Sequence, residues 1–221
     1  QPTIFSYPHY EPRKWGLALA PLMMIAAIGV TNTQISIVIL GFSSTDSQVA
    51  VMRLAERGAM LVGLPLVLAN MVAAPHFAIL FRSGKKSALQ DIARKTAGYS
   101  FLMGIPIACT LIFFGEKIIA VVFGSEYADA TYIPLLILVA GQLANVFFGS
   151  VGYLLAMTGH ERDSLKGQIF AVFANITLCS VLAPLYGATG AAMGAGVGLL
   201  IWNAMLSRYV MKRLGVRSSA I

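Results

Sequence analysis

The segment RLAER, Arg53 to Arg57, places three charged side chains within five residues of a strongly apolar stretch. An arginine at the centre of a membrane helix costs roughly 2.5–3.5 kcal/mol on insertion scales, so these charges need compensation or water. On a helix, Glu56 lies three residues from Arg53. This spacing predicts that Glu56 contacts Arg53 across the helix face and leaves Arg57 the less neutralised arginine.

Two interpretations of this charged trio are open. Residues 58–81 are long enough to cross the bilayer alone, which would place the trio at the outer interface. Alternatively, the helix is longer and its outer third lines a water-filled vestibule, where the arginines face an anionic substrate. Arginine suits a phosphate in particular, because its planar fork makes bidentate, charge-assisted hydrogen bonds.

Two other apolar segments carry polar clusters. The run TNTQIS, residues 31–36, is polar at five of six positions and covers more than one helical turn, which favours a hydrated cavity over a purely structural network. Gln142 and Asn145 are three residues apart and share a helix face, so they indicate an interior wall. The single amides Asn175 and Asn203 are more typical of packing hydrogen bonds than of ligand contacts.

The composition indicates a membrane protein. Hydrophobic residues make up 57% of the 221 residues and charged residues only 11%, whereas soluble domains carry about 25% charged residues. We expect an all-α bundle of six transmembrane helices, because six segments approach the length of about 20 residues that a membrane helix needs. They cover residues 15–41, 49–81, 97–114, 132–158, 165–185 and 189–211. Residues 115–130 are predicted to form a short interfacial helix and turn.

The basic residues predict the orientation. The net charge is +7, and most Lys and Arg fall at the termini and in alternate connections, which is how membrane topology is set and requires no nucleic acid. Under the positive-inside rule both termini are cytoplasmic, with residues 1–14 as a linker, 15–214 as the six-helix lobe and 215–221 as a tail. The cytoplasmic cations are Arg13, Lys14, Arg82, Lys85, Lys86, Arg94, Lys95, Arg162, Lys166, Arg208, Lys212, Arg213 and Arg217.

Small residues predict how the last segment packs. Gly190, Gly194 and Gly198 recur every four residues, so they line one face and predict a close helix–helix seam. Pro65 and Pro106 each remove a backbone hydrogen bond and favour local kinks. Cys109 and Cys179 lie inside apolar runs, and we expect neither a disulfide nor a thiolate metal site from them.

No pattern of catalytic residues is visible. The sequence has no paired-carboxylate site, no His and Cys spacing for a metal, no nucleophile elbow and no phosphate-binding loop. We therefore expect a protein that is not an enzyme and that needs no cofactor or metal.

Several loose motifs follow one another in a distinctive order. AP at residues 74–75 is followed by an aromatic residue and a basic stretch; FGEKII and FGSEY lie at 114–119 and 123–127; MTGHER follows at 157–162 and PLYGATGAAMGAG at 184–196. In this order and spacing the chain resembles, over residues 16–212, the C-terminal half of bacterial polysaccharide flippases. These belong to the multidrug/oligosaccharidyl-lipid/polysaccharide exporter superfamily, and O-antigen flippases resemble the chain most.

The resemblance implies one lobe of a two-lobe exporter, with an N-terminal six-helix lobe as its partner. Such proteins carry an undecaprenyl-pyrophosphate-linked oligosaccharide from the cytoplasmic to the periplasmic leaflet of the bacterial inner membrane by alternating access, for O-antigen (lipopolysaccharide) or exopolysaccharide biosynthesis. It also implies that Arg53 faces the central cavity. The chain departs from its relatives at Ser36, five residues before Gly41, where they often have an acidic residue. Coupling to protons or sodium through a carboxylate at that point is therefore in doubt.

The leading hypothesis is a lipid-linked oligosaccharide flippase. Arg53 and Arg57 would attract the pyrophosphate, while membrane lipids surround the lipid tail. The polar path for the sugar would be lined by Thr31, Asn32, Gln34, Gln142 and Asn145. The alternatives are a multidrug or peptidoglycan-precursor exporter, a non-transporting scaffold of a glycan-assembly complex, and an integral-membrane transferase or polymerase, for which the loops offer no convincing catalytic side chain.

Overall fold

The computed structural model describes the backbone of residues 12–220 and all their side chains except those of 12–18, 20–22 and 25. Within this part of the chain every regular element is a helix, so the predicted all-α class is confirmed. The elements are α1 Pro12–Ser43, α2 Asp46–Arg82, α3 Lys86–Phe123, α4 Ser125–Phe148, α5 Val151–Met157 and α6 Glu161–Leu214.

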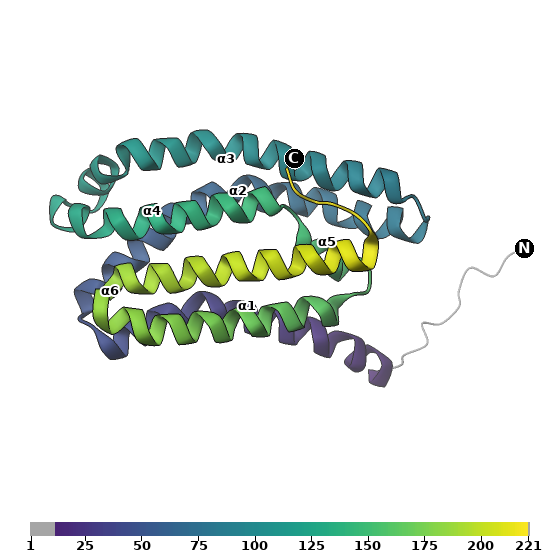
Figure 1. Ribbon diagram of the computed structural model, residues 1–221, viewed down its shortest axis with the longest axis horizontal. Helices are drawn as coiled ribbons and strands as arrows, with labels where there is room; N and C mark the ends of the chain where they lie inside the picture. Colours follow the sequence, from purple (N-terminus) through teal and green to yellow (C-terminus); the bar gives the residue numbers. More distant parts are fainter. Residues whose placement is uncertain (1–11, 221) are drawn as a thin grey trace, which may run out of the picture.

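Five described helices are long and apolar enough to cross a membrane, where six segments were predicted. The difference arises because α6, with 54 residues, contains the last two predicted segments. Its backbone leaves helical geometry at Gly187, with φ 57° and ψ −134°, and the helix runs back alongside itself (Figure 1). Gln48 holds this turn from α2, because its Oε1 accepts a hydrogen bond of 2.8 Å from the backbone N–H of Ala188.

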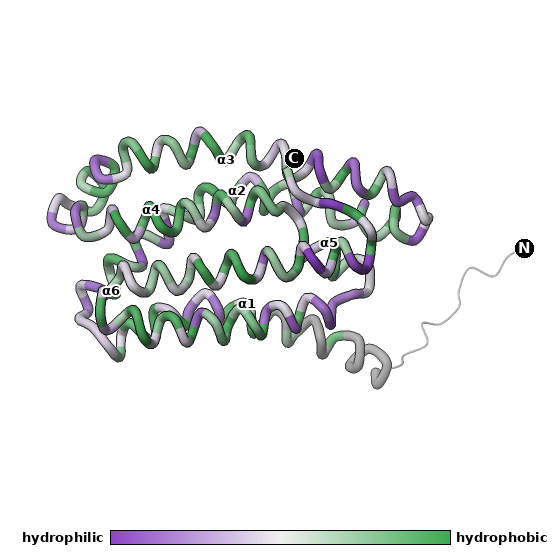
Figure 2. Tube along the Cα trace, in the orientation of Figure 1, coloured by the Kyte–Doolittle hydropathy of each residue, from purple (hydrophilic) through white to green (hydrophobic). Residues whose placement is uncertain are grey.

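The helices run roughly antiparallel, with α4 packed against α2, α3 and α6, and α1 lying along α6 (Figure 1). Apolar residues follow the middle of the bundle and polar residues gather towards its ends (Figure 2). Large apolar side chains are also widely exposed, as at Phe42, which is 90% exposed. Such a surface would be costly in water and is suited to contact with lipid tails.

The glycines of the second arm of α6 form the predicted seam. A Cβ at Gly190 would overlap the backbone of the first arm. One at Gly194 would lie 2.5 Å from the Sγ of Cys179, and one at Gly198 would lie 3.1 Å from the Cβ of Asn175. Because real side chains do not pack this closely, the two arms can approach only where the second arm has no side chain. The predicted helix–helix seam is confirmed.

We expect Gly194→Leu to lower the melting temperature of the detergent-solubilised protein, because its side chain would force the two arms apart. Overpacking in a tight interior costs about 1–3 kcal/mol. Gly196→Ala is the matched control two residues along, since a Cβ there would meet Ile137 at an ordinary contact distance of 3.6 Å. Equal melting temperatures for Gly194→Leu and the control would contradict a tight seam.

Two segments differ from their predicted boundaries. The helix α3 is continuous from Lys86 to Phe123, so the expected interfacial helix at 115–130 is wrong. Its first half belongs to α3 and its second half to α4, and the chain turns at Gly124, where φ is 105°. Only glycine adopts such a backbone at little cost, and the turn therefore falls on this residue.

The helices α2 and α3 also pass through Pro65 and Pro106 without leaving helical conformation.

The fourth predicted segment, 132–158, is broken rather than continuous. The helix α4 ends at Phe148, and Gly149 follows with φ 71° and ψ −147°. A Cβ at Gly149 would lie 2.6 Å from the Cβ of Ala97, so glycine is needed here for space as well as for conformation. Ser150 then donates a hydrogen bond to the Oδ1 of Asn70 on α2, which fixes the break against a neighbouring helix.

The chain after α6 folds back onto this break. Ser218 donates its hydroxyl to the carbonyl of Phe148 at 3.0 Å, and the N–H of Ala220 donates to the carbonyl of Phe147 at 2.9 Å. These contacts satisfy carbonyl groups that the end of α4 leaves free. The segment predicted as a tail thus packs on the bundle over 215–220. Of the predicted linker, 12–14 belong to α1, and 1–11 lie outside the described residues.

Candidate functional site

A cavity of about 320 Å³ opens between four helices, and polar side chains from each of them line it. Residues of α1, α2, α4 and α6 meet at this hollow. The size is within the range of small-molecule binding pockets. Its lining residues are Asn32, Thr33, Gln34, Ser36, Arg53, Glu56, Arg57, Ala59, Met60, Leu138, Gly141, Gln142, Asn175, Ala195, Gly196 and Leu199.

The helix α2 brings all the formal charge to this cavity. Residues 53, 56 and 57 share one face of the helix, and residues on the opposite face, such as Ala55 and Val62, are buried in the core. Arg53 and Arg57 are exposed, whereas Glu56 is half-buried. Arg53, Glu56 and Arg57 therefore line the cavity, and the two arginines are open to it.

Glu56 forms no ion pair with Arg53, although Arg53 exerts a larger electrostatic influence on it than Arg57 does, as the spacing predicts. Among the described residues, no arginine nitrogen lies within the 4.0 Å of a Glu56 oxygen that an ion pair requires. The long arginine side chains line the cavity, where water can solvate them. An exposed ion pair with Glu56 would add little stabilisation over this solvation. Arg53 and Arg57 are thus both unpaired, and the cavity carries a formal net charge of +1.

The wall formed by α1 and α6 is held together by Asn175. Its Nδ2 donates to the Oδ1 of Asn32 at 3.0 Å and to the backbone carbonyl of Asn32 at 3.2 Å. Its Oδ1 accepts from the hydroxyl of Ser36 at 3.2 Å and from the thiol of Cys179 at 3.1 Å. Asn175 makes the packing hydrogen bonds expected of it and also lines the cavity. Neither Cys179 nor Cys109 forms a disulfide with a described residue.

The wall formed by α4 is an amide chain that leads away from the cavity. Gln142 lines the cavity, and its Oε1 accepts a hydrogen bond of 3.3 Å from the Nδ2 of Asn145. The Oδ1 of Asn145 accepts in turn from the Nδ2 of Asn203 on α6 at 3.0 Å. Asn203 is buried behind the wall, which agrees with its predicted packing role.

The structure brings together five of the seven residues predicted for a substrate site. Asn32, Gln34, Arg53, Arg57 and Gln142 line one cavity, although they come from three separate helices. Thr31 does not line it, because its hydroxyl is exposed and donates to the backbone carbonyl of Ala27. Asn145 lies one layer behind the wall, where it bonds Gln142 on one side and Asn203 on the other.

Sequence reasoning missed several lining residues. Thr33 and Ser36 were present in the TNTQIS run and could have been included, since a polar run longer than a helical turn surrounds most of the helix. Asn175 was assigned to packing alone, and Glu56 was treated only as a partner of the arginines. The small residues Gly141 and Gly196 carry no polar signal, so their place in the lining depends on how α4 and α6 meet.

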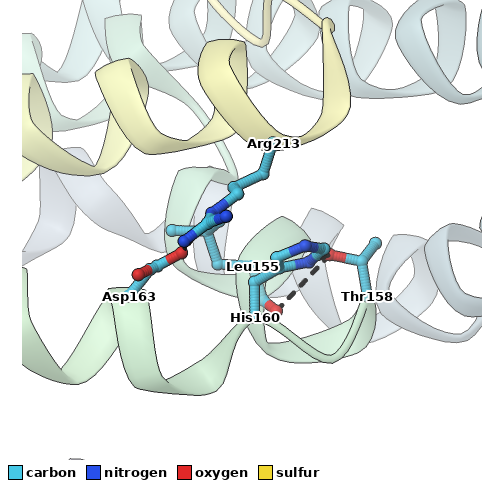
Figure 3. A network of polar contacts seen from close by, with 5 residues as sticks. All are labelled: Leu155, Thr158, His160, Asp163 and Arg213. Carbon is cyan, nitrogen blue, oxygen red and sulfur yellow. Dashed lines mark hydrogen bonds and ion pairs between the residues drawn. The ribbon is translucent and has the colours of Figure 1, made fainter.

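A second polar cluster lies where α5 meets the two ends of α6 (Figure 3). Arg213, near the end of α6, donates from Nε to the Oδ2 of Asp163 at 2.7 Å, near its beginning. The Oγ1 of Thr158 lies 3.2 Å from the Nδ1 of His160, and the backbone N–H of His160 donates to the carbonyl of Leu155. The ion pair joins the two arms of α6 at their open ends, and the other two contacts hold the connection between α5 and α6.

A wider hollow of about 490 Å³ adjoins this cluster and is lined by residues 159–163, Lys166 and Arg213. It lies beside the connection between α5 and α6 rather than between the long helices, and its ion pair already neutralises two of its charges. We place the candidate site in the smaller cavity, where both arginines are unpaired. In the described residues, no group of three or more His, Cys, Asp or Glu side chains is arranged to hold a metal ion.

Comparison with known proteins finds two distant relatives, and no family model matches the chain. It is 25% identical over 201 residues to "Capsular polysaccharide biosynthesis protein CapF" of Staphylococcus aureus, which covers 86% of this chain and 47% of that protein. It is 22% identical over 192 residues to "Probable low-salt glycan biosynthesis flippase Agl15" of Haloferax volcanii, which covers 86% of this chain and 40% of that protein. The chain spans less than half the length of either relative. By similarity and by fold it is a multi-helix membrane chain distantly related to proteins named for glycan biosynthesis.

Proposed function

We propose that the chain forms one lobe of a flippase that carries a polyprenyl-pyrophosphate-linked oligosaccharide across the membrane by alternating access. The observation that carries the proposal is the cavity, in which two unpaired arginines and several amides face a common space inside an apolar bundle. The similarity to a protein named as a glycan biosynthesis flippase supports the same conclusion.

In this proposal the charged side chains bind one part of the substrate and the amide side chains bind another. The guanidinium groups of Arg53 and Arg57 would bind the pyrophosphate, because each can donate two parallel hydrogen bonds to phosphoryl oxygens. The amides of Asn32, Gln34 and Gln142 would receive the sugar hydroxyls. The exposed apolar surface of the helices would leave the lipid tail in the bilayer while the head group crosses. In this proposal the substrate crosses without chemical change.

The remaining features of the proposal concern the whole protein. The second wall of the pathway would come from an N-terminal lobe of six helices, since this chain spans less than half of each relative. The protein would lie in a bacterial inner membrane, with both termini of this chain on the cytoplasmic side. The glycan it carries would be used to build O-antigen or exopolysaccharide. A multidrug exporter of the same superfamily is less well supported, because a cavity with a net positive charge would repel the cationic drugs that such proteins carry.

A translocation assay in liposomes tests the proposal. We expect the complete protein to move a fluorescent lipid-linked oligosaccharide between leaflets at least about tenfold faster than protein-free liposomes, because it would lower the cost of moving the charged group through hydrocarbon. The measurement is the fraction of fluorophore that an impermeant quencher reaches with time. A rate equal to that of protein-free liposomes would contradict transport and would favour a scaffold role.

A further inference from the structure

The hydrogen bonds of the α4 wall end on a group whose polarity is fixed. Asn203 donates from Nδ2 to the backbone carbonyl of Leu199 at 2.9 Å. A carbonyl can only accept, so the amide nitrogen of Asn203, not its oxygen, must face Leu199. The second hydrogen of the same nitrogen points to Asn145, so Asn145 must present its oxygen to Asn203.

The orientation of Asn145 in turn fixes that of Gln142 at the edge of the cavity. Because the oxygen of Asn145 faces Asn203, its nitrogen faces Gln142 and donates to the Oε1 of that side chain at 3.3 Å. The Oε1 also lies against Gly63 of α2, where a Cβ would come within 3.0 Å of it. The oxygen end of Gln142 is thereby confined to the protein side. Its NH₂ group has no acceptor among the described residues and is left for the cavity.

The opposite wall follows the same rule. Asn175 uses both hydrogens of Nδ2, one on the backbone carbonyl of Asn32 and one on the Oδ1 of Asn32. The side-chain oxygen of Asn32 is therefore occupied, and its NH₂ group has no acceptor among the described residues. The hydroxyls of Thr33 and Ser36 point their hydrogens away, towards Val30 and Asn175.

We propose that Asn145 and Asn203 are positioning residues that turn the donor end of Gln142 into the cavity, so that the site selects a multiply charged oxyanion. This inference rests on the proposed function. It assigns the anion selectivity of the site to a relay of hydrogen bonds that begins at the backbone carbonyl of Leu199 and passes through Asn203 and Asn145 to Gln142. Apart from the carboxylate of Glu56 and the hydroxyl oxygens of Thr33 and Ser36, the polar side chains whose orientation is fixed offer N–H donors. A pyrophosphate, which can only accept hydrogen bonds when fully ionised, matches this set, whereas a lipophilic cation does not.

A double-mutant cycle on the complete, detergent-solubilised protein tests the relay with inorganic pyrophosphate as the probe. We expect Asn145→Leu to weaken pyrophosphate binding about three- to tenfold, the loss typical of one misdirected hydrogen bond. Gln142→Leu should cause a similar loss. In the Gln142→Leu background, Asn145→Leu should have no further effect, because its action passes through the side chain already removed. Isothermal titration calorimetry measures the four affinities.

Asn70→Leu is the matched control, since Asn70 is also a buried amide but bonds Ser150 away from the cavity. We expect it to lower the melting temperature and leave pyrophosphate affinity unchanged. If Asn145→Leu cannot be purified, Asn145→Asp keeps the bond from Asn203 but can only accept from Gln142. Gln142 would then turn its amide oxygen towards the cavity. We expect pyrophosphate affinity to fall more than about tenfold, since the reversed amide dipole of Gln142 and the new negative charge of Asp both oppose the anion.

The outcomes separate this inference from the proposed function. If the wild-type protein does not bind pyrophosphate, the proposed function fails and the relay fails with it. If the wild type binds and the arginine variants do not, but Asn145→Leu and Asn145→Asp bind as tightly as the wild type, the relay is overturned and the proposed function stands. An equal loss from Asn145→Leu in both backgrounds would also overturn it, because Asn145 would then act without Gln142.

Discussion

Replacing Arg53 and Arg57 together by alanine is expected to abolish surface glycan while the amount of protein in the membrane stays constant. Both side chains are exposed to the cavity and neither has an ion-pair partner among the described residues, so their removal leaves no buried charge behind. Each lost charge-assisted hydrogen bond costs about 1.5–3 kcal/mol, so the pair together should lower pyrophosphate affinity by two to four powers of ten. Glycan staining and immunoblotting of the membrane measure the two quantities.

The matched control is the double variant Arg82→Ala and Arg94→Ala. These arginines are also exposed, but they do not line the cavity. We expect normal surface glycan from the control and partial function from Arg53→Lys with Arg57→Lys, because lysine keeps the charge and loses the bidentate fork. Normal surface glycan in the double alanine variant at Arg53 and Arg57 would remove both residues from the mechanism.

The fold could be predicted where one physical signal dominates. Apolar length predicted the membrane segments, since a helix must be long enough to cross the hydrocarbon whatever its neighbours are. The spacing of Gly190, Gly194 and Gly198 predicted the seam for a similar reason, because close approach of two helices needs small residues at helical spacing. Both signals are local: the structure confirms the seam, and it has five helices long enough to cross a membrane, the longest of which contains two predicted segments.

The errors fall where a single glycine changes the path of the backbone. The break at Gly149 lies inside an apolar run whose hydropathy continues on both sides, and nothing in the pattern separates it from the helical Gly141. What distinguishes them is tertiary contact, because the break is fitted to Ala97 and to the carbonyl of Ser218, distant in sequence. The turn at Gly124 falls inside the predicted range 115–130, but the separate interfacial helix was wrong, since the apolar run before the turn extends α3 beyond its predicted end.

The candidate site could be predicted as a set of residues but not as a geometry. Polar residues in apolar helices gather towards a common interior, which explains why Asn32, Arg53 and Gln142 meet. The sequence could not distinguish Gln142 at the surface of the wall from Asn145 behind it, since both share a helix face. That distinction depends on Asn203, which lies on another helix and takes up the oxygen of Asn145.

The carboxylate of Glu56 is expected to weaken the binding of pyrophosphate that Arg53 and Arg57 promote. It lines the same cavity as Arg53 and Arg57 without an ion pair to either, so a bound pyrophosphate would meet its negative charge. Like charges repel, so this carboxylate opposes the anion, and the two arginines beside it offset part of the repulsion. We therefore expect Glu56→Gln to raise pyrophosphate affinity about three- to tenfold.

Tighter binding should not make a faster transporter. Substrate release follows crossing, and a ligand held more tightly in the cavity leaves it more slowly, so we expect the rate of translocation by Glu56→Gln to fall as affinity rises. Calorimetry and the liposome assay measure the two effects, and raising the salt from about 0.1 M to 1 M should reduce the gain in affinity by screening. Glu126→Gln is the control, because Glu126 is an exposed carboxylate outside the cavity. An unchanged or weaker affinity in Glu56→Gln would mean that this carboxylate does not face the bound anion, and would leave Arg53 and Arg57 as the charged side chains of the described cavity lining that the anion meets.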